Sequence, residues 1–399
     1  MVCSRWLHRA VSMVIAGVTL GLAVSLTVQT ARATDELEPT PAGTGIRAIP
    51  PEENAAGWLM AGGCAIDPTD YGRGAIGEAS ARPYSEWSPE LVDSVRQSLH
   101  RQQTALEMLH RAATLDRSSY VFEYRRGLDA EMPDTEVPNV LPLVKACRLL
   151  LAEARVAAAD GDEDTALLAL ATMGRLASSL ERESSVLTAL IGVACERMML
   201  AAAAETLVCG QPWTADPAFV EQLAATLSTE DLRAMMGRAL ESSNLQVPEV
   251  ATEPSSVADE WARSEFERAH AIARELVDAP YGSAPGWDSS PEDEGVVAGL
   301  ALVNLRSAVA RHQAALAQRQ LVQTAIALRR LAIAEGGYPA DRAAVPELTE
   351  PDPFTGRPLL YDVREDGSAE VALDRADELL AEIVLKGAAS VPPITLPAP

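Results

Sequence analysis

The chain has 399 residues and a formal net charge of −24, because 57 acidic side chains outnumber 33 basic ones. Hydrophobic residues make up 48% of the sequence and aromatic residues only 4%, so the core must be built from Leu, Ala, Val and Met, which suit closely packed helices. The acidic surplus repels phosphate groups, and it therefore argues against nucleic acid and anionic lipid head groups as partners.

The first 33 residues have the composition of a Sec-type signal sequence. Arg5 and Arg9 form a basic head, an uncharged stretch follows, and an acidic region begins just after Ala33. Small residues at positions −3 and −1 are typical of signal peptidase sites, so Ala31 and Ala33 predict cleavage after Ala33.

The apolar stretch at 10–28 is 19 residues long, which is also enough to span a bilayer. Residues 1–33 are therefore expected to be either a cleaved signal peptide or a retained signal anchor. In both cases the basic head stays inside and the rest of the chain is exported. The sequence thus predicts an extracytoplasmic protein, periplasmic or secreted, which residues 10–28 anchor to the inner membrane if they are not removed.

Residues 34–51 have the Pro, Gly and Thr content of a linker, and residues 52–280 are expected to form a helical body. Three stretches of the body carry apolar side chains on more than one face, which indicates helices buried at its centre. Short turns separate them, so neighbouring helices are expected to be antiparallel. The helices are predicted at 138–159, 163–181, 184–208, 215–227, 229–242 and 256–278.

Further helices are predicted near the start of the body. A short one is expected within 52–63, and the stretch 63–87 after it is expected to be irregular because it shows no periodicity. Ser88 and Pro89 then supply the N-cap and first position of a helix whose apolar face continues to about residue 115.

Residues 281–335 are predicted to be a loop followed by the longest helix, at about 295–335, packing on the body. Gly336 and Gly337 end this helix in the manner of a glycine C-cap. The next segment, 336–375, is rich in proline and glycine, and it is expected to form a turn-rich β-hairpin module. Residues 376–399 are expected to be a short helix and a Pro-rich tail.

The fold class predicted from these elements is mainly α. It is a multi-helix bundle of antiparallel helices rich in Ala and Leu, with one long helix and a small C-terminal β-hairpin module. In the hairpin, Leu359, Tyr361 and Val363 alternate with Leu360 and Asp362, and Asp366-Gly367 supplies the turn.

Removal of the leader leaves four cysteines, an even number that permits disulfides in an oxidising compartment. Cys195 and Cys209 are too far apart along one helix, about 21 Å, to bond to each other. If the three central helices run up, down and up, Cys147 and Cys195 lie at similar height. This pair is the predicted disulfide, and four buried free thiols are the alternative: Cys64, Cys147, Cys195 and Cys209.

The sequence contains no His-Glu-x-x-His, Gly-x-Ser-x-Gly or Cys-x-x-Cys motif, so no metal and no cofactor are predicted. Residues 72–77 match Gly-x-Gly-x-x-Gly, but with no apolar strand before them and no helix directly after them they are interpreted as a loop. Two groups of side chains remain that a folded chain could gather into a site, although a solvated or edge position is the simpler interpretation. They are the histidines His100, His110, His270 and His312 and the carboxylates Glu181, Glu183 and Glu196.

Eight residues that follow the long helix stand in a recognisable order: Gly337, Tyr338, Pro339, Asp352, Pro353, Gly356, Pro358 and Tyr361. This order resembles the C-terminal module of type II secretion pseudopilins, in which a helix also leads into Gly-x-Tyr-Pro and an Asp-Pro-x-Gly-x-Pro turn. The match covers about 321–373. Some pseudopilins bind calcium in this region, but Asp352, Asp362 and Asp366 follow no complete ligand loop, so no metal is carried over.

A broader resemblance covers about 54–373. The stretches ENAAGWLM and ALEMLHRAATL, the Leu- and Ala-rich helices with AAADGDEDTALLAL, and the tail together resemble a group of uncharacterised bacterial envelope proteins. Members of that group have a leader or anchor, a helical body and a similar C-terminal module. The resemblance implies fold and compartment, and it implies no activity.

Three functions are compatible with these features. The favoured one is a non-catalytic exported scaffold or accessory protein of the bacterial envelope, with a protein as partner. The second is a pseudopilin-related secretion component, which requires processing at Gly17 instead of after Ala33. The third is an envelope hydrolase, which requires a pocket that gathers histidines or carboxylates in the folded chain.

Overall fold

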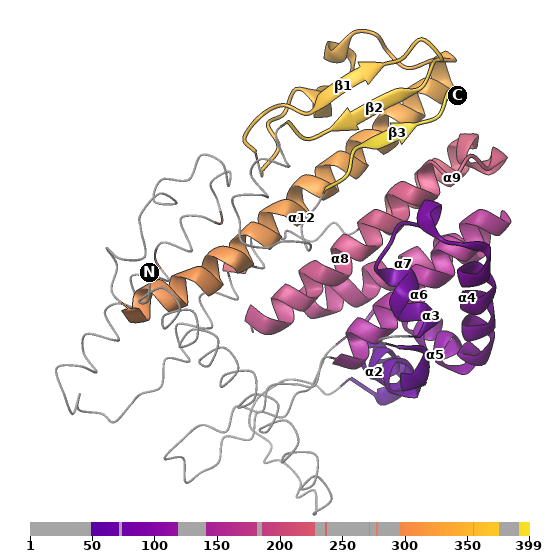
Figure 1. Cartoon of the computed structure of the whole chain (residues 1–399), viewed down its shortest axis with the longest axis vertical. Helices are drawn as coiled ribbons and strands as arrows, with labels where there is room; N and C mark the ends of the chain where they lie inside the picture. The colour runs from indigo at the N-terminus through magenta and orange to yellow at the C-terminus, as the bar shows by residue number, and fades with distance from the viewer. Residues whose placement is uncertain are drawn as a thin grey trace, which may run out of the picture. The chain divides into compact units, whose positions relative to one another are not determined.

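The computed structural model confirms the mainly helical fold class. Nine helices account for 70% of the described residues, and a three-stranded antiparallel sheet lies towards the C-terminus (Figure 1). The residues that the structure describes are 49–71, 74–118, 141–181, 186–227, 236–237, 271, 277, 296–353, 355–374 and 391–399.

Part of the predicted architecture lies outside these ranges. This applies to the signal segment with Ala31 and Ala33, to nearly all of the linker, to most of the helices predicted at 229–242 and 256–278, and to the short helix expected after 376. Within the described ranges, no helix combines the length and the apolar character that crossing a membrane requires.

The first helices of the described chain are short. Two of them begin at side-chain caps: Asn54 accepts a hydrogen bond from the N–H of Ala56 at 3.2 Å, and Ser88 accepts one from the N–H of Leu91 at 3.3 Å. The Ser88 cap is the one that the sequence predicts. The helices are α2 (Ala55–Ala65), α3 (Ala75–Ser80), α4 (Pro89–Arg101) and α5 (Gln103–Ala113).

The sequence prediction was wrong at two points here. The stretch expected to be irregular contains α3, and the helix expected to run to about 115 is interrupted at Gln102, where φ is −93° and ψ is 11°. The Gln102 side chain is buried. It donates to Asp70 Oδ2 at 2.9 Å and accepts from the N–H of Asp67 at 3.1 Å. Long-range hydrogen bonds therefore fix a break that local periodicity does not reveal.

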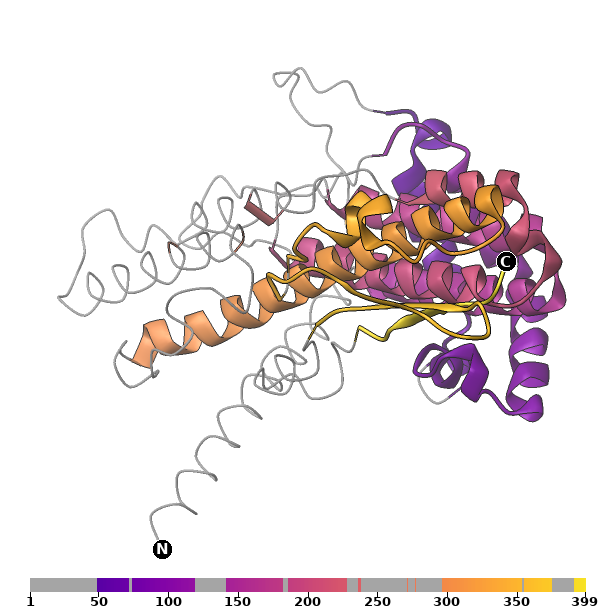
Figure 2. The ribbon, with the colours of Figure 1, turned by 90° about the horizontal axis from the view of Figure 1, so that it is seen from above.

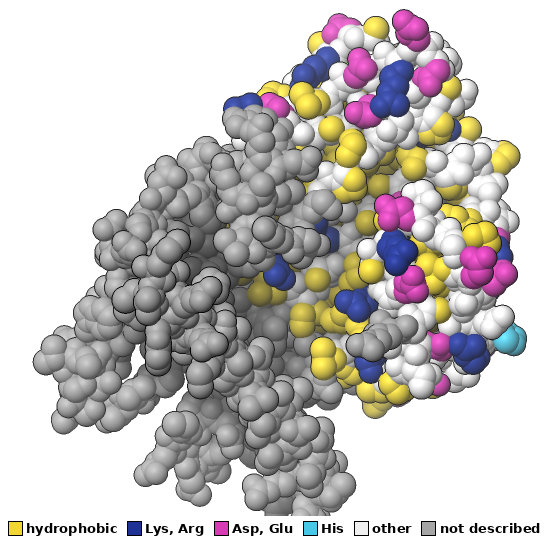
Figure 3. Space-filling model, in the orientation of Figure 1, with side chains coloured by type: hydrophobic (Ala, Val, Ile, Leu, Met, Phe, Trp, Pro, Cys, Tyr) yellow, Lys and Arg dark blue, Asp and Glu magenta, His cyan; other side chains and the backbone are white. Residues whose placement is uncertain are grey.

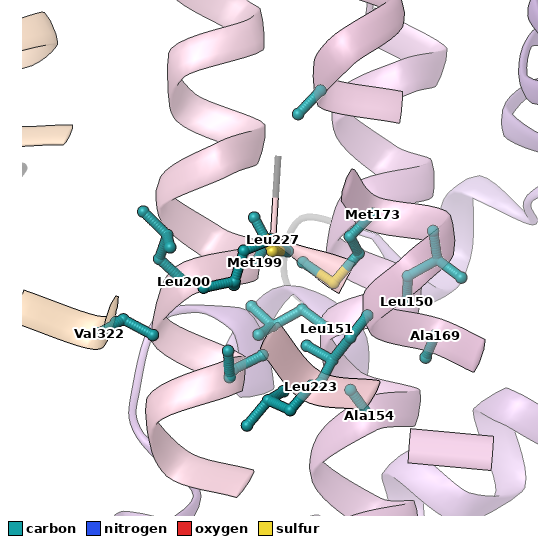
Figure 4. Close-up of a cluster of buried hydrophobic side chains, with 14 of the residues drawn as sticks. Leu150, Leu151, Ala154, Ala169, Met173, Met199, Leu200, Leu223, Leu227 and Val322 are labelled. Carbon is teal, nitrogen blue, oxygen red and sulfur yellow. The ribbon is translucent and has the colours of Figure 1, made fainter. Parts of the chain in front are cut away.

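The centre of the fold is formed by α6 (Leu141–Asp160), α7 (Glu163–Glu181) and α8 (Val186–Leu207), close to the predicted bounds. Helix α7 runs antiparallel to both neighbours, so α6 and α8 run in the same direction (Figure 1). The close-up in Figure 4 shows side chains of all three helices meeting in one cluster with α9 (Pro217–Thr226). The labelled members are Leu150, Leu151, Ala154, Ala169, Met173, Met199, Leu200, Leu223, Leu227 and Val322.

The long helix α12 (Val296–Glu335) packs along α8, and its bounds agree with the prediction. A buried ion pair joins the two helices, since Arg319 Nε donates to Glu196 Oε1 at 2.6 Å and the Glu196 side chain is fully buried. The helix ends as expected at Gly336, which has a φ of +76° and donates its N–H to the carbonyl of Ala332 at 2.9 Å.

The sheet contains the predicted hairpin and one additional strand. Strands β1 (Leu360–Val363) and β2 (Ala369–Ala372) pair antiparallel through a turn with Gly367 at a φ of +80°. The Pro-rich tail then supplies β3 (Ile394–Leu396), which pairs with β2 and buries Ile394 and Leu396. Both views show the sheet lying against α12 (Figures 1 and 2).

Two glycines of α2 allow a matched test of this packing. A Cβ on Gly63 would lie 2.3 Å from the carbonyl oxygen of Pro142, a backbone atom at the start of α6, whereas a Cβ on Gly57 meets nothing closer than 4.0 Å. Alanine raises helix propensity equally at both sites, by about 1 kcal/mol. We expect Gly63→Ala to lower the free energy of unfolding by roughly 2 kcal/mol, and Gly57→Ala to leave it unchanged or raise it, as measured by urea denaturation. Equal effects of the two substitutions would contradict this account of the α2–α6 contact.

Candidate functional site

A cavity of about 490 Å³ lies where the C-terminal ends of α6 and α8 meet the 3₁₀ turn Tyr84–Glu86. The two helices end on the same side of the bundle because they run in the same direction. Gly161 and Gly210, with φ of +79° and +74°, follow the two helix ends. The side chains that shape the cavity include Tyr84, Ser85, Arg155, Ala159, Glu205 and Cys209.

Arg155 is the central polar residue of this cavity, and it is almost fully buried. Its Nε and Nη2 donate to Glu205 Oε2 at 2.8 Å and Oε1 at 2.6 Å, and its Nη1 donates to the carbonyls of Ala79 at 3.0 Å and Arg82 at 2.9 Å. Glu205 Oε2 also accepts from the N–H of Tyr84 at 3.3 Å. Arg155 and Glu205 thus fasten the segment after α3 to both α6 and α8.

Two aromatic rings lie close to Arg155, and one of them, Tyr84, lines the cavity. The Arg155 guanidinium lies 5.8 Å from the centre of the Trp87 ring, and the rings of Tyr84 and Trp87 are 4.9 Å apart in a tilted arrangement. Trp87 Nε1 donates to the carbonyl of Arg82 at 3.3 Å. The guanidinium and the indole N–H of this group are therefore bonded to the protein itself.

The titratable groups of the cavity are uncharged or compensated at neutral pH. Burial raises the pKa of the Tyr84 hydroxyl, and the nearby Asp160 carboxylate raises it further. Burial likewise raises the pKa of the Cys209 thiol. Arg155 and Glu205 neutralise each other, so the cavity offers hydrogen bonds and apolar surface but no net charge.

A second cluster contains the hydroxyl, imidazole and carboxylate that a hydrolase requires. His110 on α5 has its Nδ1 3.1 Å from Thr172 Oγ1 on α7 and its Nε2 2.9 Å from Glu153 Oε2 on α6. Thr172 is fully buried, and it donates its hydroxyl hydrogen to the carbonyl of Leu168 at 2.8 Å. The residues lining the cavity do not include any of this cluster. His110 therefore joins three helices at a place apart from the cavity.

His100, His312 and Glu196 do not line the cavity. His100 is exposed, as expected, but His312 is fully buried in α12 and not at a surface or edge. The surface interpretation was also wrong for Glu196, which pairs with Arg319 inside the protein. The Glu181 side chain, Glu183 and His270 lie outside the described residues.

The Gly-x-Gly-x-x-Gly segment is only partly described, since residues 72–73 lie outside. A helix does begin directly after Gly74, contrary to the prediction, but a 3₁₀ turn (Pro68–Asp70) precedes it where a dinucleotide site needs a strand. A Cβ on Gly74 would lie 2.4 Å from the carbonyl oxygen of Thr69. Close backbone packing therefore accounts for this glycine.

Tyr338 of the C-terminal motif anchors the tail. Its hydroxyl donates to the carbonyl of Pro397 at 2.9 Å, and Arg329 Nη1 donates to both the Tyr338 hydroxyl at 3.1 Å and that carbonyl at 3.0 Å. Arg329 Nε also donates to the carbonyl of Thr214 at 3.2 Å. This buried network joins α12, the end of β3 and the segment between α8 and α9.

The other polar residues of the motif stabilise its turns. The Asp352 carboxylate accepts from the N–H of Thr355 at 2.7 Å and from its hydroxyl, and the carbonyl of Asp352 accepts from the N–H of Gly356 at 2.9 Å. Gly356 has a φ of +71°, which a glycine adopts without strain. Tyr361 donates its hydroxyl to the carbonyl of Pro339 at 2.8 Å. Each of these residues therefore has a structural role, and none points into the cavity.

The structure brings Cys147 and Cys195 together, at the height that the up-down-up arrangement predicts. The Cys147 thiol lies 3.6 Å from the carbonyl oxygen of Cys195, and both residues are fully buried free thiols. Cys64 is exposed on α2 and Cys209 lines the cavity. The disulfide between Cys147 and Cys195 stays a prediction.

No family model, no curated protein and no solved structure matches this chain. Across the described ranges, no group of three or more His, Cys, Asp or Glu side chains is arranged to hold a metal ion. Sequence reasoning missed the cavity, because Arg155 and Glu205 lie inside helices where they resemble ordinary surface charges.

The role of Arg155 can be tested by its removal. We expect Arg155→Met to lower the free energy of unfolding by about 3 kcal/mol, because Glu205 and two backbone carbonyls lose their donor. Arg330→Met is the matched control, since Arg330 pairs with Glu221 at an exposed position and its loss should cost less than about 1 kcal/mol. Chemical denaturation of both variants measures the difference in free energy of unfolding. Equal effects would show that Arg155 does not hold the segment after α3 against α6 and α8.

The raised pKa of Tyr361 predicts that the stability of the fold depends on pH in the alkaline range. Burial, with a smaller effect of Tyr338, raises its pKa to about 12, above an ordinary value of about 10, so the fold favours the neutral phenol. The stability it contributes is complete below pH 10 and is lost as the pH rises towards 12. Tyr361→Phe should cost about 1 kcal/mol at pH 8, and its difference from wild type should shrink above pH 10. A difference that is constant from pH 8 to 11 in urea denaturation, with Tyr71→Phe as control, would contradict this.

Proposed function

We propose that the chain is a non-catalytic helical scaffold or accessory protein of the bacterial envelope, and that it binds another protein. The observation that supports this proposal is that the charged side chains in the 490 Å³ cavity are already hydrogen-bonded within the protein. Arg155 and Glu205 use their hydrogen bonds on each other and on the backbone. Catalysis by these groups would require them to be released for a substrate, whereas recognition requires a recess of fixed shape.

The chemistry of the cavity favours an uncharged side chain as its occupant. Its volume lies within the range of about 300–1,000 Å³ that is usual for ligand sites. Ala158, Ala159 and Val208 supply apolar surface, while Ser85 and Gln211 lie beside them with polar groups. A partner that inserts one aromatic or aliphatic side chain, or a short turn of peptide, fits this combination.

The charge distribution agrees with a protein partner. On the face shown in Figure 3, acidic and basic side chains are interspersed over the described surface, with no area of one sign. Such a surface does not attract a polyanion, and the net charge of −24 opposes one. The envelope location rests on the basic, apolar and small-residue order of residues 1–33, which supports export.

The proposal is tested by photo-cross-linking in the membrane and envelope fractions of cells that produce the full chain. A photoreactive phenylalanine analogue at the exposed, cavity-lining Ser85 should give a discrete cross-linked partner. The same analogue at Ala218, which is exposed at the start of α9, is the control and should not.

A second substitution shows whether the cavity itself is recognised. Ala159→Leu places a larger side chain on the cavity wall, and it should reduce the Ser85 cross-link at least five-fold while the unfolding midpoint stays within a few degrees. Ala218→Leu should leave the cross-link unchanged. Persistence of the cross-link in the Ala159 variant, or identical products from Ser85 and Ala218, would overturn the assignment.

A further inference from the structure

Cys147 and Cys195 meet in the contact between α6 and α8. Both are fully buried, and the Cys147 thiol lies 3.6 Å from the Cys195 carbonyl oxygen. The two cysteines are 48 positions apart in the sequence, and the antiparallel helix α7 between them returns the chain to the same height. A disulfide requires Cα atoms within about 7 Å of each other, and the Cys147 thiol already lies against the backbone of Cys195.

We propose that this pair is oxidised to a disulfide that fastens α6 to α8, and that an extracytoplasmic thiol–disulfide oxidoreductase supplies the oxidant. The thiolate of one cysteine attacks the disulfide of the oxidant, which forms a mixed disulfide and releases one thiol of the oxidant. The second cysteine then displaces the remaining sulfur. The chain loses two electrons and two protons, and the disulfide of the oxidant gains them as it becomes two thiols.

The reaction takes place during folding, when α6 and α8 have met but the surrounding helices do not yet cover the two sulfurs. In the folded protein neither sulfur is reachable, because both residues are fully buried. Burial, together with the adjacent Cys195 thiol, also raises the pKa of Cys147 well above its usual value, so the reactive thiolate is scarce once the helices have packed. A chain that has just been exported and is only partly folded meets neither obstacle.

The other two cysteines remain thiols in this proposal. Cys64 is exposed on α2, and Cys209 lies beyond the end of α8 on the wall of the cavity. Cys209 is 14 positions after Cys195, and most of that separation is helical, which places them about 20 Å apart. Cys147 and Cys195 are therefore the cysteine pair that packing of the described helices brings together.

Oxidative refolding of the full chain tests the pairing. The reduced and denatured protein is refolded in a glutathione and glutathione disulfide buffer, alkylated, digested and mapped by mass spectrometry. We expect the peptides of Cys147 and Cys195 to be linked, and Cys3, Cys64 and Cys209 to be alkylated. The double variant Cys64→Ala with Cys209→Ala should keep the linkage. Recovery of Cys147 and Cys195 as alkylated thiols, or linked to other cysteines, would overturn the proposal.

A second experiment tests whether the disulfide forms during folding or afterwards. When the folded, reduced protein is placed in the same buffer, the pair should oxidise at least ten-fold more slowly than during refolding. Equal rates would show that the folded state exposes the thiols and would overturn the proposed order. The refolding experiment involves neither a membrane nor a protein partner, so its outcome is independent of whether the Ser85 cross-link succeeds.

Discussion

Close approach of α6, α7 and α8 is the constraint on which the rest of the structure depends. With aromatic residues at only 4%, the chain reaches the density of a protein interior only if its helix backbones come near one another. Gly174 on α7 shows how near α9 comes to these helices, since a Cβ there would lie 2.8 Å from the carbonyl oxygen of Thr226 at the end of α9. Where small side chains let backbones touch, one helix has little space to shift against the next. The ends of the helices are therefore held in fixed positions relative to one another.

A core of Leu and Ala is poor at specifying which helix lies against which, because many packings bury similar areas. Buried polar contacts supply that specification here. Arg155 with Glu205 joins α6 to α8, and Arg319 with Glu196 joins α8 to α12. The network of Arg329 then joins α12 to the tail. Each contact links segments far apart in the sequence, and a different packing would leave a charge buried without a partner.

Elements whose signal is local could be predicted from the sequence. Apolar faces and turn residues placed α6, α7, α8 and α12 close to their observed bounds, and they also placed the hairpin. The interruption at Gln102 and the strand β3 depend on distant partners, so periodicity did not reveal them. The cavity was missed for the same reason, since Arg155 and Glu205 are 50 positions apart. The nearness of Cys147 and Cys195 was foreseeable because it follows from helix length and turn length alone.

The position of β3 in the sequence has a consequence for how the protein comes to be folded. Helices α6 to α8 are complete in the sequence long before residues 394–396, whereas the sheet lacks its third strand until these residues have left the ribosome. Pro397, whose carbonyl holds Tyr338 and Arg329, emerges with them. The C-terminal region therefore completes its packing only after all the helices that precede β3 in the sequence have been synthesised.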